Sequence, residues 1–330
     1  MHDELNNLQK NTSIMFCEHE RKKLYTIAIG YKSVLSVLPL SASSTTMCEF
    51  MNQMNYPSIF QDCKIQFLSS CNGLVWISRI SPSWVEDYYI WNPSTKVYKN
   101  IPMAREVNWR DIKGYGFGCD NKTDDYKLIR IVVDWESECS SVDIYTLSSN
   151  SWKNTQTVPY HLCDIGASYP GVLFKGALHY PAHTFRKDST VLVCFNIVSE
   201  GFEEVAVPKA LIPYPKGKQD MLGIDVGVSG ECLCLAFHVF NVRVDVWIMQ
   251  DYGLQESWTN IFSITQESIT STRYLELVWS FKNNETLWEV DQGIVLYDPT
   301  NKTYRKLLLD SHGTERETVA RNYMVTSVWL

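Results

Sequence analysis

Residues 88–102 read YYIWNPSTKVYKNIP: an apolar strand, a polar turn, an aromatic residue and a short strand that ends in proline. The pattern recurs at 142–159 (VDIYTLSSNSWKNTQTVP), 191–208 (VLVCFNIVSEGFEEVAVP), 244–264 (VDVWIMQDYGLQESWTNIFSI) and 293–309 (GIVLYDPTNKTYRKLLL). The aromatics that follow the turns are Tyr98, Trp152, Phe202, Trp258 and Tyr304, which lie 54, 50, 56 and 46 residues apart. A repeat of this length predicts one small structural unit per copy.

Each copy carries the chemistry of a β-hairpin. Asp-Pro, Asn-Pro or Ser-Ser-Asn favours a type I turn, and the aromatic then resumes the strand. A second pair of strand-like segments precedes each hairpin, for example CNGLVWIS before the first and VLFKGALHYPA before the third. These segments are rich in β-branched and aromatic residues, which favour strands. The sequence therefore predicts four strands per unit.

The chain ends supply further strand-like segments, KLYTIAIG (23–30), KSVLSVLPL (32–40) and YMVTSVWL (323–330). A ring of sheets that stays open exposes strand edges, so we expect these ends to pair and close it. The predicted fold is all-β, a single β-propeller of six four-stranded blades, with seven blades as the nearest alternative. It occupies residues 21–330 and follows a disordered or partly ordered segment, 1–20. A β-sandwich would use similar strands but has no reason to repeat every fifty residues.

Composition excludes several classes of protein. Among 330 residues, 30 Lys and Arg face 37 Asp and Glu, and a net charge of −7 argues against a nucleic-acid-binding surface. The polar N-terminus, MHDELNNLQKNTS, lacks the apolar stretch of a secretory signal, and no apolar run approaches the length of a membrane helix. Ten scattered cysteines without a CxxC pair indicate free thiols. We expect a cytoplasmic location, with the nucleus as a second compartment, and no membrane contact.

Six ordered motifs resemble the plant F-box-associated domain. They are SSCNGLVWI (69–77), WNPSTKVYKNIP (91–102), GYGFGCDNKTDDYKLIRIV (114–132), VDIYTLSSNSWK (142–153), GVLFKGALHY (171–180) and the 244–264 copy. The ordered match covers about residues 65–265, with weaker likeness to the end. This resemblance implies a kelch-like propeller that captures a target protein.

The resemblance also implies partners. In that family, which includes the S-locus F-box proteins of pollen, an N-terminal F-box docks on the Skp adaptor of a cullin-based ubiquitin ligase. Nothing in residues 1–20 resembles the Leu-rich F-box helices, so Skp binding is expected only where an F-box is present. The acidic net charge favours a basic target, and a target resembling the basic S-RNases would fit.

Three motifs suggest small-ligand chemistry, and each has a better structural explanation. The glycines of GYGFGCD (114–120) are not followed by the helix that a phosphate site needs, and close strand packing explains them. Cys232, Cys234 and His238 share one strand face and could hold zinc, but apolar neighbours favour core packing. HYPAHTF (179–185) is expected to be a surface loop because Pro181 breaks a helix. We expect no cofactor and no metal.

A carbohydrate-acting propeller, either a glycosidase or a lectin, is the alternative function. A glycosidase needs two carboxylates, which any two blades can supply without a local motif. The densest acidic group is Asp124, Asp125, Asp134, Glu136 and Glu138. Solvated loop charge is the simpler explanation of this group.

The favoured function is a non-catalytic protein-interaction module. Tryptophan and arginine in loops dominate interface energies, and four segments place such residues in expected loops. The candidate partner-binding residues are Trp84, Tyr88, Arg105, Trp109, Arg110, Trp135, Glu136, His183, Phe185 and Arg186.

Overall fold

A computed structural model describes residues 12–18, 23–28, 52–54, 56–60, 63–82, 86–162, 169–185, 190–209, 222–239, 242–265, 275–280, 285–290, 293–307 and 318–324. The chain divides into two compact units, one of residues 1–101 with 268–330 and the other of residues 102–267. Within the described ranges the regular structure is β-strand, apart from the 3-10 turns η2 (Ser58–Phe60), η3 (Trp109–Asp111) and η6 (Gln255–Ser257). These ranges contain no helix that is both long and apolar enough to cross a membrane.

Two sheets lie wholly within residues 102–267. The first contains β8 (Ile112–Asp120), β9 (Asp125–Asp134), β10 (Cys139–Thr146) and β11 (Ser151–Val158) in sequence order, with β13 (Tyr169–Pro170) parallel to the β8 edge. The second contains β12 (Tyr160–Leu162), β14 (Val172–Phe174), β15 (Ala177–Thr184), β16 (Thr190–Asn196) and β17 (Gly201–Val205). Both β12 and β14 pair with β15, at different ends of that strand.

The remaining strands form three sheets. One is the meander β4 (Lys64–Cys71), β5 (Leu74–Ile80), β6 (Glu86–Trp91) and β7 (Tyr98–Ile101). A second has the order β26-β1-β2-β3, and the third is eight-stranded, in the order β21-β20-β19-β18-β22-β23-β24-β25. Its strands are β18 (Leu222–Ser229), β19 (Cys232–Val239), β20 (Arg243–Met249), β21 (Trp258–Thr265), β22 (Leu275–Ser280), β23 (Thr286–Val290), β24 (Gly293–Asp298) and β25 (Thr303–Leu307).

The described strands therefore form five sheets, and the prediction of six four-stranded blades is wrong in number. The cause is the eight-stranded sheet, which contains two meanders, β18–β21 and β22–β25. Each meander carries its own copy of the sequence repeat, so the repeat counts meanders and cannot show that two of them share one sheet. The seven-blade alternative is wrong for the same reason.

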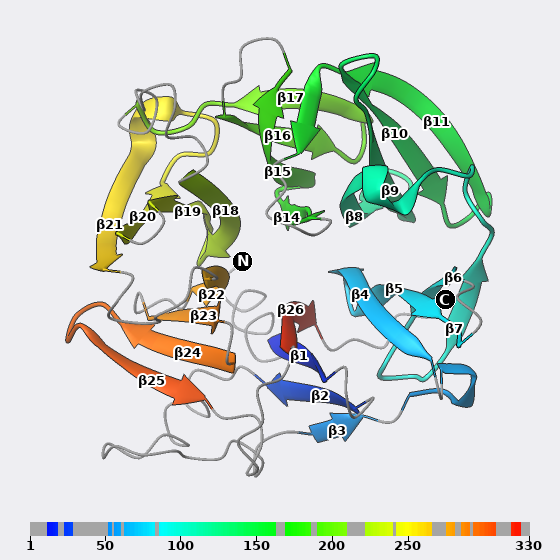
Figure 1. Ribbon diagram of the computed structural model, residues 1–330, viewed down its shortest axis with the longest axis horizontal. Helices are drawn as coiled ribbons and strands as arrows, with labels where there is room; N and C mark the ends of the chain where they lie inside the picture. Colours follow the sequence, from blue (N-terminus) through cyan, green and yellow to red (C-terminus); the bar gives the residue numbers. More distant parts are fainter. Residues whose placement is uncertain are drawn as a thin grey trace. The chain divides into compact units, whose positions relative to one another are not determined.

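The chain ends pair, as predicted, but not through the predicted segments, because the strand that pairs with β26 comes from residues 12–18 and not from 23–30 or 32–40. Strand β1 (Thr12–Glu18) pairs antiparallel with β26 (Thr318–Met324), from Thr12 opposite Met324 to Glu18 opposite Thr318 (Figure 1). On its other side β1 pairs with β2 (Lys23–Ala28), which pairs with β3 (Asn52–Met54). Strand β1 lies within the segment 1–20 that the sequence left partly ordered at most. The predicted segments 32–40 and 325–330 lie outside the described residues.

The repeated turns share a backbone feature. The Asn92 side-chain Oδ1 accepts hydrogen bonds from the backbone N–H groups of Ser94 (2.9 Å) and Thr95 (3.2 Å), which fixes the turn before β7. A residue with positive φ comes two positions before the aromatic in four of the five copies: Lys96 (62°), Asn150 (50°), Glu200 (56°) and Lys302 (53°). This conformation returns the chain into the last strand of the meander. The aromatic is the first or second residue of that strand, which agrees with the prediction that it resumes the strand.

Two of these aromatics also bind the segment that enters their own meander from the preceding one. The Trp152 indole Nε1–H donates to the Pro102 carbonyl (2.8 Å), and the Trp258 indole donates to the Ala206 carbonyl (2.7 Å). Pro102 and Ala206 are the first residues after β7 and β17, so each indole binds the chain as it leaves the preceding meander. The aromatic of the repeat thus contacts the segment between two meanders in these two copies, in addition to its place in the hairpin.

The glycines of 114–120 serve close packing, as expected. They lie in β8, and β9 rather than a helix follows. A Cβ atom at Gly116 would lie 2.3 Å from the Tyr180 hydroxyl, and one at Gly118 would lie 2.7 Å from an Ile197 methyl. Tyr180 and Ile197 are fully buried in the core between the first two sheets of residues 102–267.

The expectation of a surface loop at HYPAHTF is wrong. Residues 177–184 form β15, in which His179 is fully buried and His183 is half-buried. Pro181 falls between the part of β15 that pairs with β14 and the part that pairs with β12, where the ladder on that side is interrupted. A proline is tolerated in a strand at such an interruption, although it would break a helix.

Candidate functional site

The turn between β9 and β10 presents a large exposed aromatic side chain. The Asp134 Oδ1, at the end of β9, accepts hydrogen bonds from the backbone N–H groups of Glu136 (3.0 Å) and Ser137 (3.1 Å). Hydrogen bonds from Ser137 lower the pKa of Asp134, so this cap is charged at neutral pH. Trp135 lies between Asp134 and Glu136 in this turn and is 54% exposed. The turn is ordered locally, so Trp135 is held at the surface.

Trp135 is supported by a cluster of rings from the neighbouring sheet. Its ring centroid lies 5.3 Å from that of His161 and 6.0 Å from that of Phe185. His161 also contacts Phe185 (4.9 Å) and His183 (5.3 Å). His161 in β12 and His183 in β15 are direct cross-strand partners, which explains their contact. We call Trp135, His161, His183 and Phe185 the aromatic cluster.

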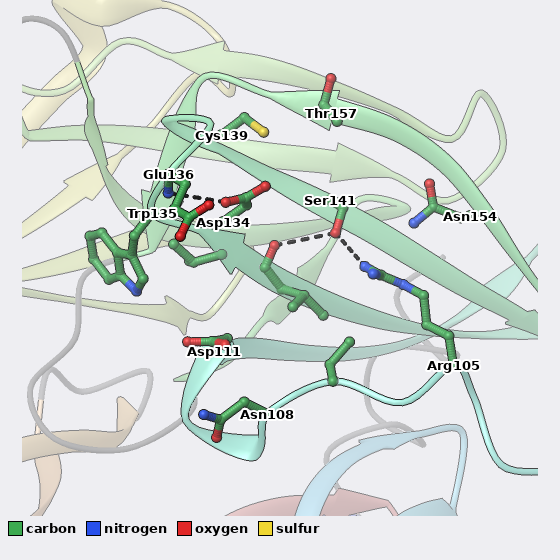
Figure 2. Close-up of a pocket in the computed structure, with 13 residues that line it drawn as sticks. Arg105, Asn108, Asp111, Asp134, Trp135, Glu136, Cys139, Ser141, Asn154 and Thr157 are labelled. Carbon is green, nitrogen blue, oxygen red and sulfur yellow. Dashed lines mark hydrogen bonds between the residues drawn. The ribbon is translucent and has the colours of Figure 1, made fainter.

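A cavity of about 670 Å³ adjoins Trp135. Its walls come from residues 105–111, from β9, β10 and the turn between them, and from β11. Figure 2 shows Asp134, Trp135 and Glu136 at one end and Arg105 with Asn154 at the other. This volume falls in the range of ordinary ligand sites. We call this space the Trp135 cavity.

The Arg105 end of the cavity rests on a buried ion-pair network. The Asp143 carboxylate is 2% exposed and accepts hydrogen bonds from both Arg130 Nη2 (2.7 Å) and Arg105 Nε (2.9 Å). Asn154 Nδ2 donates to the same carboxylate (2.9 Å), and Arg105 Nη2 donates to the Ser141 hydroxyl. Arg105 is therefore fixed in place although its side chain is 45% exposed.

The network sets the charge state of Asp143. Burial raises the pKa of this carboxyl group, but hydrogen bonds from Arg130, Asn154 and Arg105 together outweigh burial and lower the pKa below its ordinary value. Asp143 is thus ionised and balances one of the two arginines. Since Arg130 is only 4% exposed, the excess positive charge reaches the cavity through Arg105.

The opposite end of the cavity is acidic. Asp111, Asp134 and Glu136 line it, and within the described part of the chain none of the three forms an ion pair. The cavity is therefore dipolar, with a guanidinium at one end and three carboxyl groups around the exposed tryptophan at the other. Such a site favours a ligand that carries positive charge where it meets Trp135.

Comparison with known proteins identifies the family. The model of the F-box associated beta propeller domain matches residues 13–328. The chain belongs to this family. The match confirms the predicted propeller class and the resemblance on which the functional expectation rests. It also covers most of strand β1, which precedes the expected start of the domain at residue 21.

Curated relatives of this propeller are plant proteins. "F-box protein CPR1" of Arabidopsis thaliana is 32% identical over 265 residues, which cover 72% of this chain and 62% of that protein. "F-box/kelch-repeat protein At3g23880" of the same plant is 23% identical, covering 80% of this chain and 68% of the relative. The chain thus matches about two thirds of the length of each relative.

Similar solved structures include "Crystal structure of TolB from Acinetobacter baumannii", at 10% identity and a TM-score of 0.49, covering 95% of this chain and 67% of that one. "Structure of SapL1 lectin in complex with alpha methyl fucoside" has 11% identity and a TM-score of 0.48, covering 93% of this chain and 99% of that one. Similarity this low carries no functional argument.

The structure brings together five of the ten candidate residues of this propeller. Trp135, His183 and Phe185 belong to the aromatic cluster, and Arg105 and Glu136 line the cavity beside it. Sequence segments 30 to 80 residues apart thus meet at one surface. No local motif could show this, because the contact depends on how β9, β12 and β15 are arranged.

The other five candidates do not join this site. Tyr88 was expected in a loop but is a buried residue of β6, with its ring 6.1 Å from that of Trp76, so that expectation is wrong. Arg110 is exposed in η3 but does not line the cavity. Trp84, Arg186 and the side chain of Trp109 lie outside the described residues.

Sequence reasoning missed His161 and the polar network of Ser141, Asp143 and Asn154. The network had a signal in the sequence and His161 had none. Asp143 and Arg130 are charged residues inside apolar strands, and such residues need a partner when they are buried. His161 precedes Leu162 in a short segment that carries no repeat motif, so its strand was invisible to a search for repeats.

Two of the five acidic residues of the carbohydrate alternative have structural roles in turns. Asp125 caps a turn by accepting hydrogen bonds from Ser148, and Asp134 caps the Trp135 turn with a lowered pKa. A glycosidase acid needs a raised pKa instead. A second hollow of about 440 Å³ is lined partly by Asp120 and Glu200, which both pair with the buried Lys127 (2.9 and 3.0 Å).

The zinc alternative also finds no support. His238 Nε2 lies 2.8 Å from the Asp225 carboxylate, and this pair is buried. Burial raises the pKa of the Cys234 thiol to about 12, which opposes the thiolate that zinc requires. Within the described ranges, no group of three or more His, Cys, Asp or Glu side chains is arranged to hold a metal ion.

Proposed function

We propose that this propeller is the target-recognition domain of a plant F-box protein and binds its target through the aromatic cluster and the Trp135 cavity. The observation that carries the proposal is the family match over residues 13–328 together with one rigid, half-exposed tryptophan beside a cavity. Tryptophan and arginine are the residues that most often anchor protein interfaces. Trp135 and Arg105 are both held in place before any partner arrives, which lowers the entropic cost of binding.

The proposal assigns binding of the ligase adaptor to another part of an F-box protein. Residues 1–330 are therefore expected to capture the target but not the Skp adaptor. Stoichiometric retention of a Skp adaptor by this chain in a pull-down would contradict that division. The proposed location is the cytoplasm, with the nucleus as a second compartment, and the S-locus role in pollen is a narrower form of the same proposal.

Affinity capture from plant tissue tests the proposal. Tagged wild-type chain and the Trp135→Ala variant are used as baits, and Tyr304→Ala provides a matched control because Tyr304 is also about half-exposed (51%) and lies in β25. A target that is retained by the wild type and by Tyr304→Ala, and lost at least about 30-fold with Trp135→Ala, supports the proposal. Equal retention by all three baits refutes it.

A further inference from the structure

We infer that the Trp135 cavity receives an arginine or lysine side chain of the target protein, seated on the Trp135 ring between the Glu136 and Asp111 carboxylates. This inference deepens the proposed function and rests on it. The argument uses the exposed ring, the charges around it and the volume beside it.

The ring geometry leaves Trp135 available to a cation. Its contacts with His161 and Phe185 are tilted by 51° and 78°, so neither neighbour stacks flat on the indole. Slightly more than half of the side chain stays exposed despite these contacts. A cation over an indole face is attracted by the electron-rich ring, and tryptophan gives the strongest such interaction among the aromatic residues.

The charges around the ring select a cation over an anion. Glu136 is adjacent to Trp135 in sequence, and Asp111 and Asp134 line the same end of the cavity. Asp134 already accepts two backbone hydrogen bonds, whereas Asp111 and Glu136 form no ion pair within the described ranges. An incoming guanidinium or ammonium group would therefore supply the counter-charge that these two carboxylates lack.

The far end of the cavity orients the segment that carries the basic residue. Arg105 donates through Nε to Asp143 and through Nη2 to Ser141, so its guanidinium is oriented before binding. Arg105 and Arg130 carry two positive charges and Asp143 balances one of them. The remaining positive charge favours a carbonyl or carboxylate acceptor of the target at this end. A basic side chain at the Trp135 end and an acceptor at the Arg105 end match the dipole of the cavity.

Binding of short peptides to the full chain tests the inference without knowledge of the target. Fluorescein-labelled Gly-Ser-Arg-Gly-Ser and its lysine, citrulline and glutamate analogues are titrated by fluorescence anisotropy. The arginine and lysine peptides are expected to bind, and the citrulline and glutamate peptides to bind at least about tenfold more weakly. Equal affinity for the arginine and citrulline peptides overturns the inference, because charge would then have no role. Failure of every peptide to bind overturns it as well.

Two neighbouring carboxylates offer a matched pair of variants. Glu136 lines the cavity and Glu138, in the same turn, does not. Glu136→Gln is expected to weaken arginine-peptide binding about threefold and Trp135→Ala about tenfold, while Glu138→Gln leaves it unchanged. Equal losses with Glu136→Gln and Glu138→Gln would show diffuse attraction to an acidic surface and overturn the inference. Unaltered thermal unfolding of the variants ensures that any loss is local.

These outcomes separate the inference from the proposed function. If Trp135→Ala abolishes capture of the target but the arginine peptide does not bind, the surface is the target site and its occupant is not a basic side chain. If the arginine peptide binds as expected but target capture is unaffected by Trp135→Ala, the proposed function fails instead.

Discussion

Replacement of Asp143 by asparagine is expected to destabilise the protein strongly. Asp143→Asn keeps the shape of the side chain but removes the charge that balances Arg130, which is 4% exposed and bound to Asp143 through both Nε (3.1 Å) and Nη2 (2.7 Å). Breaking a buried ion pair by removing one partner costs about 3–5 kcal/mol. We expect the midpoint of thermal unfolding to fall by roughly 5–10 °C.

Two further variants show whether burial is the reason. Arg105→Leu removes the other arginine of the network, whose side chain is 45% exposed, and is expected to cost no more than about 1 kcal/mol. The double variant Arg130→Leu/Asp143→Leu removes both buried charges together and is expected to recover most of the stability lost with Asp143→Asn. Urea unfolding followed by circular dichroism measures the free energy of unfolding of Asp143→Asn, Arg105→Leu and the double variant.

The pH dependence of the stability of Asp143→Asn gives a second test of the network. The folded-state pKa of Asp143 is lowered, so its ionised form stabilises the protein above the unfolded-state pKa of about 3.9, and this contribution is lost as pH falls through the folded value. The difference in the free energy of unfolding between wild type and Asp143→Asn should therefore be constant from about pH 5 upwards and shrink in more acidic solution. A cost below about 1 kcal/mol, or a larger cost for Arg105→Leu, would refute the account of the network.

Three further predictions concern the fold. Gly116→Ala should cost about 1–3 kcal/mol because the new methyl group meets Tyr180 and Leu178 (2.3 and 2.5 Å). Gly201→Ala should leave the melting midpoint nearly unchanged, because the nearest atom to its new Cβ is the Ser199 hydroxyl at 3.8 Å, an ordinary contact. Burial lowers the pKa of His179 to about 4, so between pH 4 and about 6.5 the unfolded chain binds more protons than the folded chain. Up to about 3 kcal/mol of the free energy of unfolding should therefore be lost as pH falls through this range. Urea titrations of His179→Gln should lack this dependence of the free energy of unfolding on pH. Phe16→Pro interrupts β1, which pairs with a strand on both sides, and should lower the melting midpoint more than Gln53→Pro in the edge strand β3. A larger decrease with Gln53→Pro would show that β1 is not the inner strand.

The regular part of the fold could be predicted from sequence because its signals are local. The turn residues around Asn92 and Asp298, and the aromatics that follow them, lie within one hairpin and dictate it directly. Pairing between the chain ends was predicted from the need to cover strand edges, but the sequence did not indicate β1 as the N-terminal partner. The grouping of two meanders into one eight-stranded sheet has no such local signal. The strand at residues 177–184 did have one in VLFKGALHYPA, but Pro181 misdirected the interpretation of HYPAHTF.

The candidate site was predictable only in part. Trp135, Glu136 and Phe185 were found because exposed tryptophan and charge in turns suggest interfaces. Their association through His161 depends on the packing of two sheets, which sequence alone does not reveal. The loop expectation for Tyr88 failed because this residue stands where the expected loop meets the apolar strand of the 88–102 copy, and it belongs to the strand.

Hydrogen–deuterium exchange on the complex of this chain with its captured target tests the assignment of the binding surface most directly. Slower exchange in the target-bound chain is predicted at residues 132–141, 160–162 and 183–185, with unchanged exchange across β4–β7. Protection confined to β4–β7 or β22–β25, with none around Trp135, would contradict the account.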